Sequence, residues 1–401
     1  MKLFMLLLVP ILSVQAAAQI DNTLPADSDT IGSECTPQET VEASDDNALQ
    51  VQVKGFLDTY RAVRTEGRAD WMASRTRVRG ELKLEKGAAS LFLSLNATYN
   101  GILKERTGLE LREAYLSYAK GNFDLRVGRQ IVVWGVADAL RVTDCVSPFD
   151  YTEFLAQDYD DIRMPVNGLR AKYTRGSVTL EAVCNPVADF FVLPTDERNP
   201  WAIRLPSAPQ PYTTDLESGK PEKKIKNMEF GGRASVNLSG IDFSVSALRT
   251  WNKQPALCPA LSGDGRTLHI NGQYRRMTML GADCSLPVGQ FVLRAEVAEY
   301  IGEAQGSGLG QNAVRRNTLN ALAGVDWYPG NDWNISVQYC HKYTSGNLAA
   351  LSVYRNAGLA TARLSKELLH NTLKLSTFAY IDVASGGIFN RLSASYSLND
   401  D

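Results

Sequence analysis

Apolar and polar residues alternate at every second position through most of this chain, and this period constrains the fold more than any other feature. The clearest copy runs from Trp333 to Tyr343. One face of that segment carries Trp333, Ile335, Val337, Tyr339 and Tyr343, and the other carries Asn334, Ser336, Gln338 and Lys342. The same period returns at 123–127, 241–247 and 392–398. It is typical of strands with two different faces, and a helix cannot use it.

The connections between these strands alternate in length. Short turns are predicted at 85–87, 120–122, 174–176, 239–240, 286–289, 328–332 and 367–371. Mostly longer connections are predicted at 62–69, 101–108, 135–163, 187–226, 255–268, 303–312, 345–352 and 383–387. Barrels of the bacterial outer membrane have short turns at one end and longer loops at the other. The predicted fold is therefore all-β, a transmembrane antiparallel β-barrel of about 16 strands.

A soluble β-sandwich is the alternative fold, although sandwiches rarely place so many strands in one sheet. The last residues, Tyr396 to Asp401, leave a second question open, because barrels of this kind commonly end on an aromatic residue. Either the barrel closes with about 16 strands and an unusual end, or a final hairpin is missing and about 18 strands are needed. An unclosed edge in a membrane leaves backbone groups unpaired, so a shortened chain is expected to fold poorly.

The sequence divides into three parts. Residues 1–18 begin with Met1-Lys2, continue with an apolar run and end in small residues, so they are predicted to be a signal peptide. Residues 19–48 are acidic and contain no Lys or Arg, which predicts a mobile periplasmic tail or, alternatively, a short plug in the lumen. Residues 49–401 are predicted to form the barrel domain. The formal net charge of -2 gives no reason to expect nucleic acid.

Six cysteines fall in the exported part of the chain: Cys35, Cys145, Cys184, Cys258, Cys284 and Cys340. An even number in an oxidising compartment permits disulfides, and none of the spacings is that of a metal site. Cys258 and Cys284 are expected at opposite ends of the barrel. Cys145 and Cys184 are both expected near the outer end, so they form the more plausible pair.

The segment from Leu109 to Tyr173 departs most from a plain barrel pattern. It holds a Gly-Arg-Gln strand at 128–130, Trp134-Gly135, then Asp144-x-x-x-Pro148-x-Asp150, an acidic pair and Arg163-x-Pro165. These motifs resemble a little-characterised family of Gram-negative outer-membrane barrels, and the likeness extends over most of the mature chain. The resemblance implies location in the outer membrane and a porin-like passage for solutes. It implies no established substrate and no catalytic residue.

The residues of the long connection 135–163 support the same reading, because such a loop is unusual unless it is functional. We expect it to fold inward, so that its carboxylates face guanidiniums of the wall and form a charged constriction. The alternative is that Asp144, Asp150 and Arg163 only tie the loop to itself. The candidate constriction residues are Arg126, Arg129, Trp134, Asp138, Arg141, Asp144, Asp150, Asp160, Asp161 and Arg163.

The second long connection, 187–226, is rich in proline and aromatic residues. Such a segment is suited to lie over the pore as a lid that contacts apolar ligands, or to form a compact surface loop. Wall arginines such as Arg126, Arg233 and Arg294 indicate anionic or polar solutes, whereas the acidic loop indicates the opposite. The expected partners are membrane lipids and small solutes, no cofactor is expected, and the oligomeric state is left open.

Two other classes of function remain as alternatives. A barrel that conducts nothing and serves as a structural or adhesive element is one, although barrels of about 16 strands leave an aqueous channel unless they are plugged. A hydrolase is the other. The three histidines, His269, His341 and His370, are not followed by a motif that places a nucleophile at a suitable distance. No enzyme is therefore expected.

Overall fold

A computed structural model describes residues 48–397, except residues 66, 68, 154–158, 160, 203–210, 350 and 352. Within this part of the chain, 16 strands form one antiparallel sheet. They are β1 (Gln50–Val63), β2 (Trp71–Lys86), β3 (Ala89–Asn100), β4 (Gly108–Lys120), β5 (Phe123–Gln130), β6 (Val166–Arg175), β7 (Val178–Asn185), β9 (Glu229–Leu238), β10 (Ile241–Trp251), β13 (Arg276–Val288), β14 (Phe291–Gln305), β15 (Val314–Trp327), β16 (Trp333–Thr344), β17 (Asn356–Leu368), β18 (Leu373–Asp382) and β19 (Ile388–Tyr396). The predicted all-β fold and strand number are confirmed.

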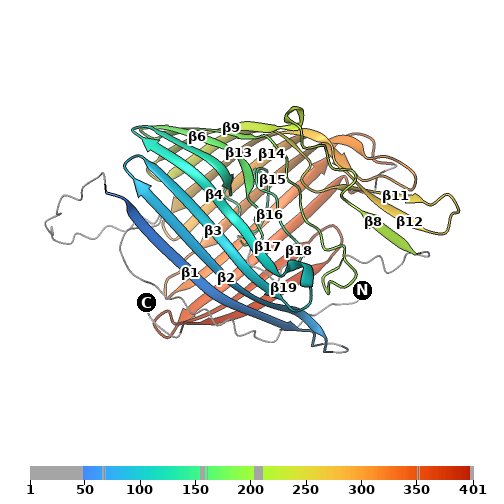
Figure 1. Cartoon of the computed structure of the whole chain (residues 1–401), viewed down its shortest axis with the longest axis horizontal. Helices are drawn as coiled ribbons and strands as arrows, with labels where there is room; N and C mark the ends of the chain where they lie inside the picture. Colours follow the sequence, from blue (N-terminus) through green and yellow to red (C-terminus); the bar gives the residue numbers. More distant parts are fainter. Residues whose placement is uncertain are drawn as a thin grey trace.

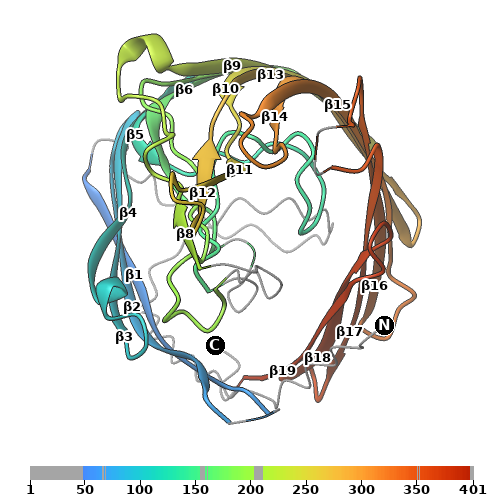
Figure 2. The same ribbon diagram turned by 90° about the vertical axis from the view of Figure 1, so that its right-hand side faces the viewer.

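Each strand of this sheet pairs with its neighbours in chain order, and the sheet curls into a barrel-shaped wall around an interior that holds loops (Figures 1 and 2). Strands β1 and β19 are its two edges, and no ladder joins them in the described residues. In the described residues of the connections lie two single-turn 3-10 helices, η1 (Lys104–Arg106) and η3 (Ile225–Asn227). No helix in the described ranges is both long and apolar enough to cross a membrane.

The two faces of the wall are opposite to those of a soluble sheet. On β16, the aromatic and aliphatic side chains of Val337 and Tyr339 are 49% and 42% exposed, whereas Ser336 and Gln338 are 4% and 1% exposed. The same arrangement holds on β10, where Val245 points outward and Ser244 inward. An apolar exterior and a polar interior are what a wall in contact with lipid requires. The predicted alternation thus assigns the faces correctly.

The expected alternation of short and long connections is also present. Two-residue turns follow β2, β4, β6, β9 and β13, and the longer connections lie at the other end of the wall. One of the predicted loops, 255–268, is wrong in detail, because Ala256–Leu261 (β11) and Leu268–Gln273 (β12) form an antiparallel hairpin. Tyr212–Asp215 (β8) adds to β12 in parallel. This three-stranded sheet projects beyond the wall in Figure 1. Paired strands therefore stand where an irregular loop was expected.

The predicted Cys145–Cys184 disulfide is wrong in this structure. All five cysteines of the described residues are unpaired. Cys145 is buried in the interior, where its thiol lies 3.5 Å from the Tyr300 hydroxyl, whereas Cys184 lies on β7 opposite Leu169. Nearness to the same end of a wide barrel does not bring two side chains together. Cys35, the predicted signal peptide and nearly all of the acidic segment 19–48 lie outside the described residues.

Candidate constriction in the barrel interior

The connection between β5 and β6 is the 131–165 loop, and its described residues, 131–153, 159 and 161–165, fold into the interior of the wall (Figure 2). Its apolar side chains are buried against one side of the wall, where several inward positions are apolar and lie among polar ones. The loop contributes Val132, Trp134, Leu140, Val142 and Val146, and the wall contributes Val183, Leu248, Met279, Ala298 and Leu322. Burial of these apolar side chains stabilises the inward conformation of the loop.

A carboxylate of the wall fixes the start of the loop. Glu296 on β14 accepts hydrogen bonds from the backbone N–H groups of Val136, Ala137 and Thr143. Gly135 has a φ of +87°, and a Cβ there would lie 2.5–2.9 Å from Thr143 Oγ1 and the two Glu296 oxygens. Only glycine therefore allows the backbone to wrap around this carboxylate. This is the physical reason for glycine in the Trp134-Gly135 pair.

The next residues of the loop are held by strands further along the wall. The side-chain amide of Gln338 on β16 makes two 3.1 Å hydrogen bonds with the backbone of Asp138. The Asp138 carboxylate lies 2.7 Å from the Arg363 guanidinium on β17. Tyr380 on β18 donates a hydrogen bond to the carbonyl of Ala139. Four strands thus position the segment 136–143.

The other end of the loop is held by an arginine ladder on the opposite side of the interior. Arg75, Arg77 and Arg79 occupy alternate positions of β2, so all three face inward, and each is less than 9% exposed. Asp161 of the loop accepts from Arg77 at 2.8 Å and from Arg79 at 3.0 Å. Glu153 of the loop lies 2.7 Å from Arg75. Charge-assisted contacts of this kind fix position more than they add stability.

The charge state of Asp161 depends on this ladder. Burial alone would raise the pKa of its carboxyl group. The hydrogen bond and the positive charge of Arg77, with the charges of Arg79 and Arg112, outweigh burial and lower the pKa to about 2. Asp161 is therefore ionised at neutral pH, and the contact between loop and wall is a contact between full charges.

The loop is also tied to itself and to neighbouring loops. Arg163 forms a buried pair with Asp144, whose carboxylate also accepts from the backbone N–H of Trp134. The guanidinium of Arg141 lies 4.3 Å above the ring of Phe149 and donates to the carbonyls of Asp144 and Ser147. Both readings of the sequence are therefore present together. Asp161 meets the wall, and Asp144 and Arg163 tie the loop internally.

The remaining candidates have separate positions. Asp150 accepts from Arg106 in the β3–β4 connection at 2.9 Å, so it joins two loops. Trp134 is buried and donates to Glu181 on β7. Arg126 faces inward on β5, where Asp124 is 3.6 Å away.

Two of the predicted positions do not reach the contacts expected of them. Arg129 donates to the carbonyl of Leu111 on β4, and neither Arg126 nor Arg129 makes a described ion pair with a loop carboxylate. Asp160 lies outside the described residues.

Reasoning from the sequence missed the wall side of this contact. The ladder Arg75, Arg77 and Arg79 is visible in the sequence as Arg-x-Arg-x-Arg within a predicted strand, which places three cations on one face. Glu296 and Gln338 carry no comparable signal, because single inward polar residues occur on nearly every strand.

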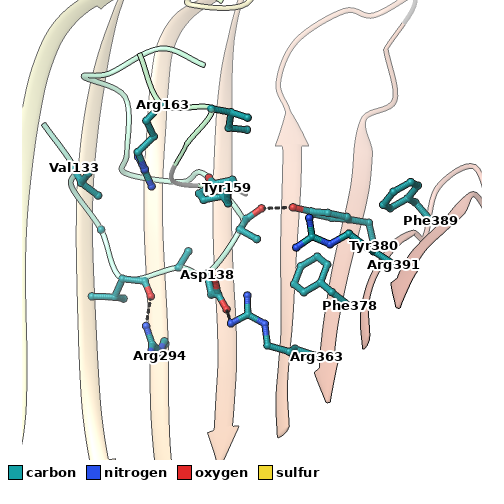
Figure 3. Close-up of a pocket in the computed structure, with 15 residues that line it drawn as sticks. Val133, Asp138, Tyr159, Arg163, Arg294, Arg363, Phe378, Tyr380, Phe389 and Arg391 are labelled. Atoms are coloured by element: carbon teal, nitrogen blue, oxygen red, sulfur yellow. Dashed lines mark hydrogen bonds and ion pairs between the residues drawn. The ribbon is translucent and has the colours of Figure 1, made fainter. Parts of the chain in front are cut away.

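Besides a cavity of about 170 Å³ at the β2 arginines, two more cavities lie beside the loop. The larger has a volume of about 1190 Å³ and is lined mainly by aromatic and aliphatic side chains of the loop, the wall and the 187–226 connection. The smaller, about 460 Å³, lies between the loop and β17–β19 (Figure 3). Guanidiniums of Arg163, Arg294, Arg363 and Arg391 line it, together with the single carboxylate of Asp138. The two linings share Ala139, Tyr159, Ile162, Tyr380 and Phe389, so the cavities adjoin.

Part of the 187–226 connection extends across the interior to the far side of the wall. Trp201 donates to the carbonyl of Met72 on β2 at 3.1 Å, and it packs beside Ala62 and Ala73. Phe191 stacks on Phe149 of the 131–165 loop. Residues of this connection thus line the larger cavity, and the choice between a lid and a compact surface loop stays a prediction. Residues 203–210 lie outside the described ranges.

The sequence pattern of a family called "Protein of unknown function (DUF1302)" matches residues 104–396. The chain belongs to this family. No curated protein matches it. The matched range includes residues 109–173, where the motifs of the predicted resemblance lie.

Solved structures of outer-membrane proteins are similar to the wall. A loop L8 deletion mutant of OmpT from Vibrio cholerae has 9% identity and a TM-score of 0.51, covering 86% of this chain and 97% of that chain. OmpF of Salmonella typhi in complex with daunomycin has 10% identity and a TM-score of 0.48, covering 88% and 100%. An anion-selective porin from Comamonas acidovorans has 10% identity and a TM-score of 0.44, covering 87% and 96%. The likeness to OmpT shows the fold alone, that of an outer-membrane β-barrel.

Proposed function

We propose that this protein is a porin-like channel of the outer membrane for the passive or facilitated passage of small polar or amphipathic solutes. The observation that carries the proposal is the position of the 131–165 loop. It is anchored to β2 through Asp161 and to β14 through Glu296, and cavities of about 460 and 1190 Å³ remain beside it. A loop that narrows an interior without filling it is what selection by size and charge requires.

A structural or adhesive barrel is the first alternative. Such a protein needs no cavity beside an inward loop, and it gains nothing from charged side chains that line one. The guanidinium of Arg363 is 37% exposed although it lies on an inward position of β17, and this favours a wet interior. The transport proposal therefore accounts for more of the interior than the adhesive alternative does.

An enzyme is the second alternative, and we propose that the chain is not one. His269 Nδ1 lies 2.7 Å from the Thr213 hydroxyl, and this is the only described histidine contact with a hydroxyl of Ser or Thr. That pair is exposed on the small sheet and lines none of the described cavities. Acid and base groups need convergent geometry around a substrate.

The test is single-channel recording of the purified full-length protein in planar bilayers, with a salt gradient that gives the ion selectivity. Discrete conductance steps are expected. A matched pair of variants, Asp161→Asn in the loop and Asp196→Asn in an exposed ion pair with Arg198, separates the constriction from general effects of charge. Only Asp161→Asn is expected to change the selectivity. A folded barrel that stays silent under all conditions would overturn the proposal.

A further inference from the structure

The two adjoining cavities have different chemistry, and together they resemble the two halves of an amphipathic molecule. The larger cavity is lined mainly by apolar side chains from separate elements, among them Leu140, Tyr151, Phe191, Trp201 and Leu359. Its lining also includes Arg64, Arg141, Lys253 and the Lys342–Glu303 ion pair. Its volume of about 1190 Å³ lies just above the usual range of ligand sites, which is about 300–1,000 Å³. An apolar body of one or more rings fits such a space by losing contact with water.

The smaller cavity is cationic. Four guanidiniums and one carboxylate are on its lining. Arg294 is held by Asp326 at 2.7 Å, and Arg163 is paired with Asp144, and neither of these acids lines the cavity. The positive ends of both pairs therefore face the space while their carboxylates lie behind. A small anion is the occupant that this field favours.

Arg363 is the guanidinium best placed to change partners. It pairs with Asp138 at 2.7 Å, and the two side chains are 37% and 30% exposed. A pair that is this accessible to water contributes little stability, so a carboxylate that enters from the cavity competes with Asp138 at low energetic cost. Figure 3 shows Arg363 and Arg391 on the wall side of the space, with Asp138 on the loop side.

Aromatic rings lie where the linings of the two cavities meet. Tyr380 and Phe389 belong to both linings, and Phe378 lies 4.8 Å from Tyr380 between ring centroids. The Tyr380 hydroxyl is bound to the carbonyl of Ala139, so this ring is fixed against the loop. A planar apolar group can lie against such rings while its charged end reaches the guanidiniums.

We propose that the two cavities form one binding site for organic monoanions with a large apolar body, that is, aromatic or alicyclic carboxylic acids. The apolar body occupies the larger cavity, and the carboxylate meets Arg363 and its neighbours in the smaller one. The inference deepens the proposed channel function, because it names the class of solute that the constriction would receive.

Binding is measured by titration calorimetry of the folded full-length barrel in detergent, with matching micelle blanks. The probes are 2-naphthoate, its neutral analogue 2-naphthalenemethanol, and acetate. We expect 2-naphthoate to bind at least tenfold more tightly than either of the others, because the alcohol lacks the carboxylate and acetate lacks the apolar rings. Equal binding of naphthoate and the alcohol, or of naphthoate and acetate, would overturn the two-part site.

Variants locate the site. Arg363→Gln is expected to weaken 2-naphthoate about tenfold and to leave the alcohol unchanged, because it removes the charge-assisted contact. Phe191→Ser is expected to weaken naphthoate and the alcohol alike. Arg233→Gln is the matched control, since Arg233 is an inward arginine paired with Asp283 and lies on neither lining. An equal loss in Arg233→Gln and Arg363→Gln would overturn the assignment.

This experiment and the bilayer recording fail independently. Steps in potassium chloride without binding of naphthoate leave the channel and remove the proposed site. Binding of naphthoate to a barrel that is silent in bilayers keeps the site and removes the channel.

Discussion

The Arg77 guanidinium on β2 donates to the Asp161 carboxylate at 2.8 Å, which joins the wall to a loop residue 84 positions further along the chain. Arg77 also holds Asp58 on β1, so one cation links two strands and the loop. Removal of one partner from such a buried cluster leaves a charge without compensation, which is more damaging than loss of an exposed pair. The first predictions follow from this contact.

Replacement of Asp161 by Asn is expected to loosen the loop without unfolding the barrel. Arg77 and Arg79 lose a full negative charge, and the anchoring of the loop weakens by about 2–3 kcal/mol. Open-channel current noise and mean conductance in planar bilayers should both rise. The Asp196→Asn control keeps both at the wild-type level. Equal conductance in all three proteins would mean that Asp161 does not hold the constriction.

Acid should release the same contact. The folded pKa of Asp161 is about 2, below the value of about 3.9 in an unfolded chain, so ionisation of Asp161 stabilises the anchored loop above pH 4. This stabilisation, of the order of 2 kcal/mol, is lost as the pH falls from about 4 to about 2. Current noise of the wild type should stay constant from pH 7 to about 4 and rise below it. Asp161→Asn should be noisy already at pH 7, and a noise increase centred near neutral pH would assign the effect to another group.

Gly135→Ala should displace the start of the loop. The new Cβ would face the Glu296 carboxylate and the Thr143 hydroxyl, in a backbone conformation with a φ of +87°. Gly121→Ala is the matched control, because Gly121 has a φ of +59° in a turn with no atom within 4 Å of the added Cβ. In this control, backbone strain alone should lower the free energy of unfolding by about 1 kcal/mol. Gly135→Ala should lower the free energy of unfolding more than the control does, and it should speed proteolysis inside 131–165. Equal decreases in the two variants would mean that the contact with the Glu296 carboxylate does not require glycine at position 135.

Much of this fold was predictable from the sequence, because its strongest rule is local. A period of two indicates which face of β16 is apolar and turns outward, and charge and length identify the predicted connection 135–163 as an unusual loop. Partners across the barrel interior are not local. Arg126 was a reasonable candidate as a wall cation, yet Asp161 meets Arg77 and Arg79, since the position of the loop depends on strand tilt and register.

The cysteines show the same limit of sequence reasoning. Cys145 and Cys184 share an end of the barrel, but the backbone of the loop directs Cys145 toward Tyr300. The apolar inward positions Leu248, Met279 and Leu322 lie on separate strands. Their common role appears only when the sheet curls around the loop.

The cysteines give a chemical prediction. Burial raises the pKa of the Cys145 thiol to about 11, against the attraction of Arg141 and the hydrogen bond with Tyr300. The reactive thiolate is therefore scarce at pH 8. Intact protein should label slowly at Cys145 with a maleimide and rapidly after unfolding, as read by mass spectrometry of the tryptic peptides. A peptide linked through Cys145 and Cys184 in the non-reduced digest would restore the disulfide that the structure lacks.

The contact between Trp201 and β2 tests whether the 187–226 connection acts as a lid over the pore. Trp201 bridges from the 187–226 connection to Met72, and its ring lines the larger cavity. Trp201→Ala removes both the hydrogen bond and the half-buried ring, and if the connection acts as a lid this should loosen it and raise the conductance. Tyr354→Ala, at a side chain that is 64% exposed and on neither cavity lining, should change nothing. Access to the interior can be measured as the rate at which externally added 2-naphthoate blocks the channel current. This rate should increase in Trp201→Ala alone. If the rate and the conductance stay at the wild-type level, then the constriction formed by the 131–165 loop, and not the lid, limits entry.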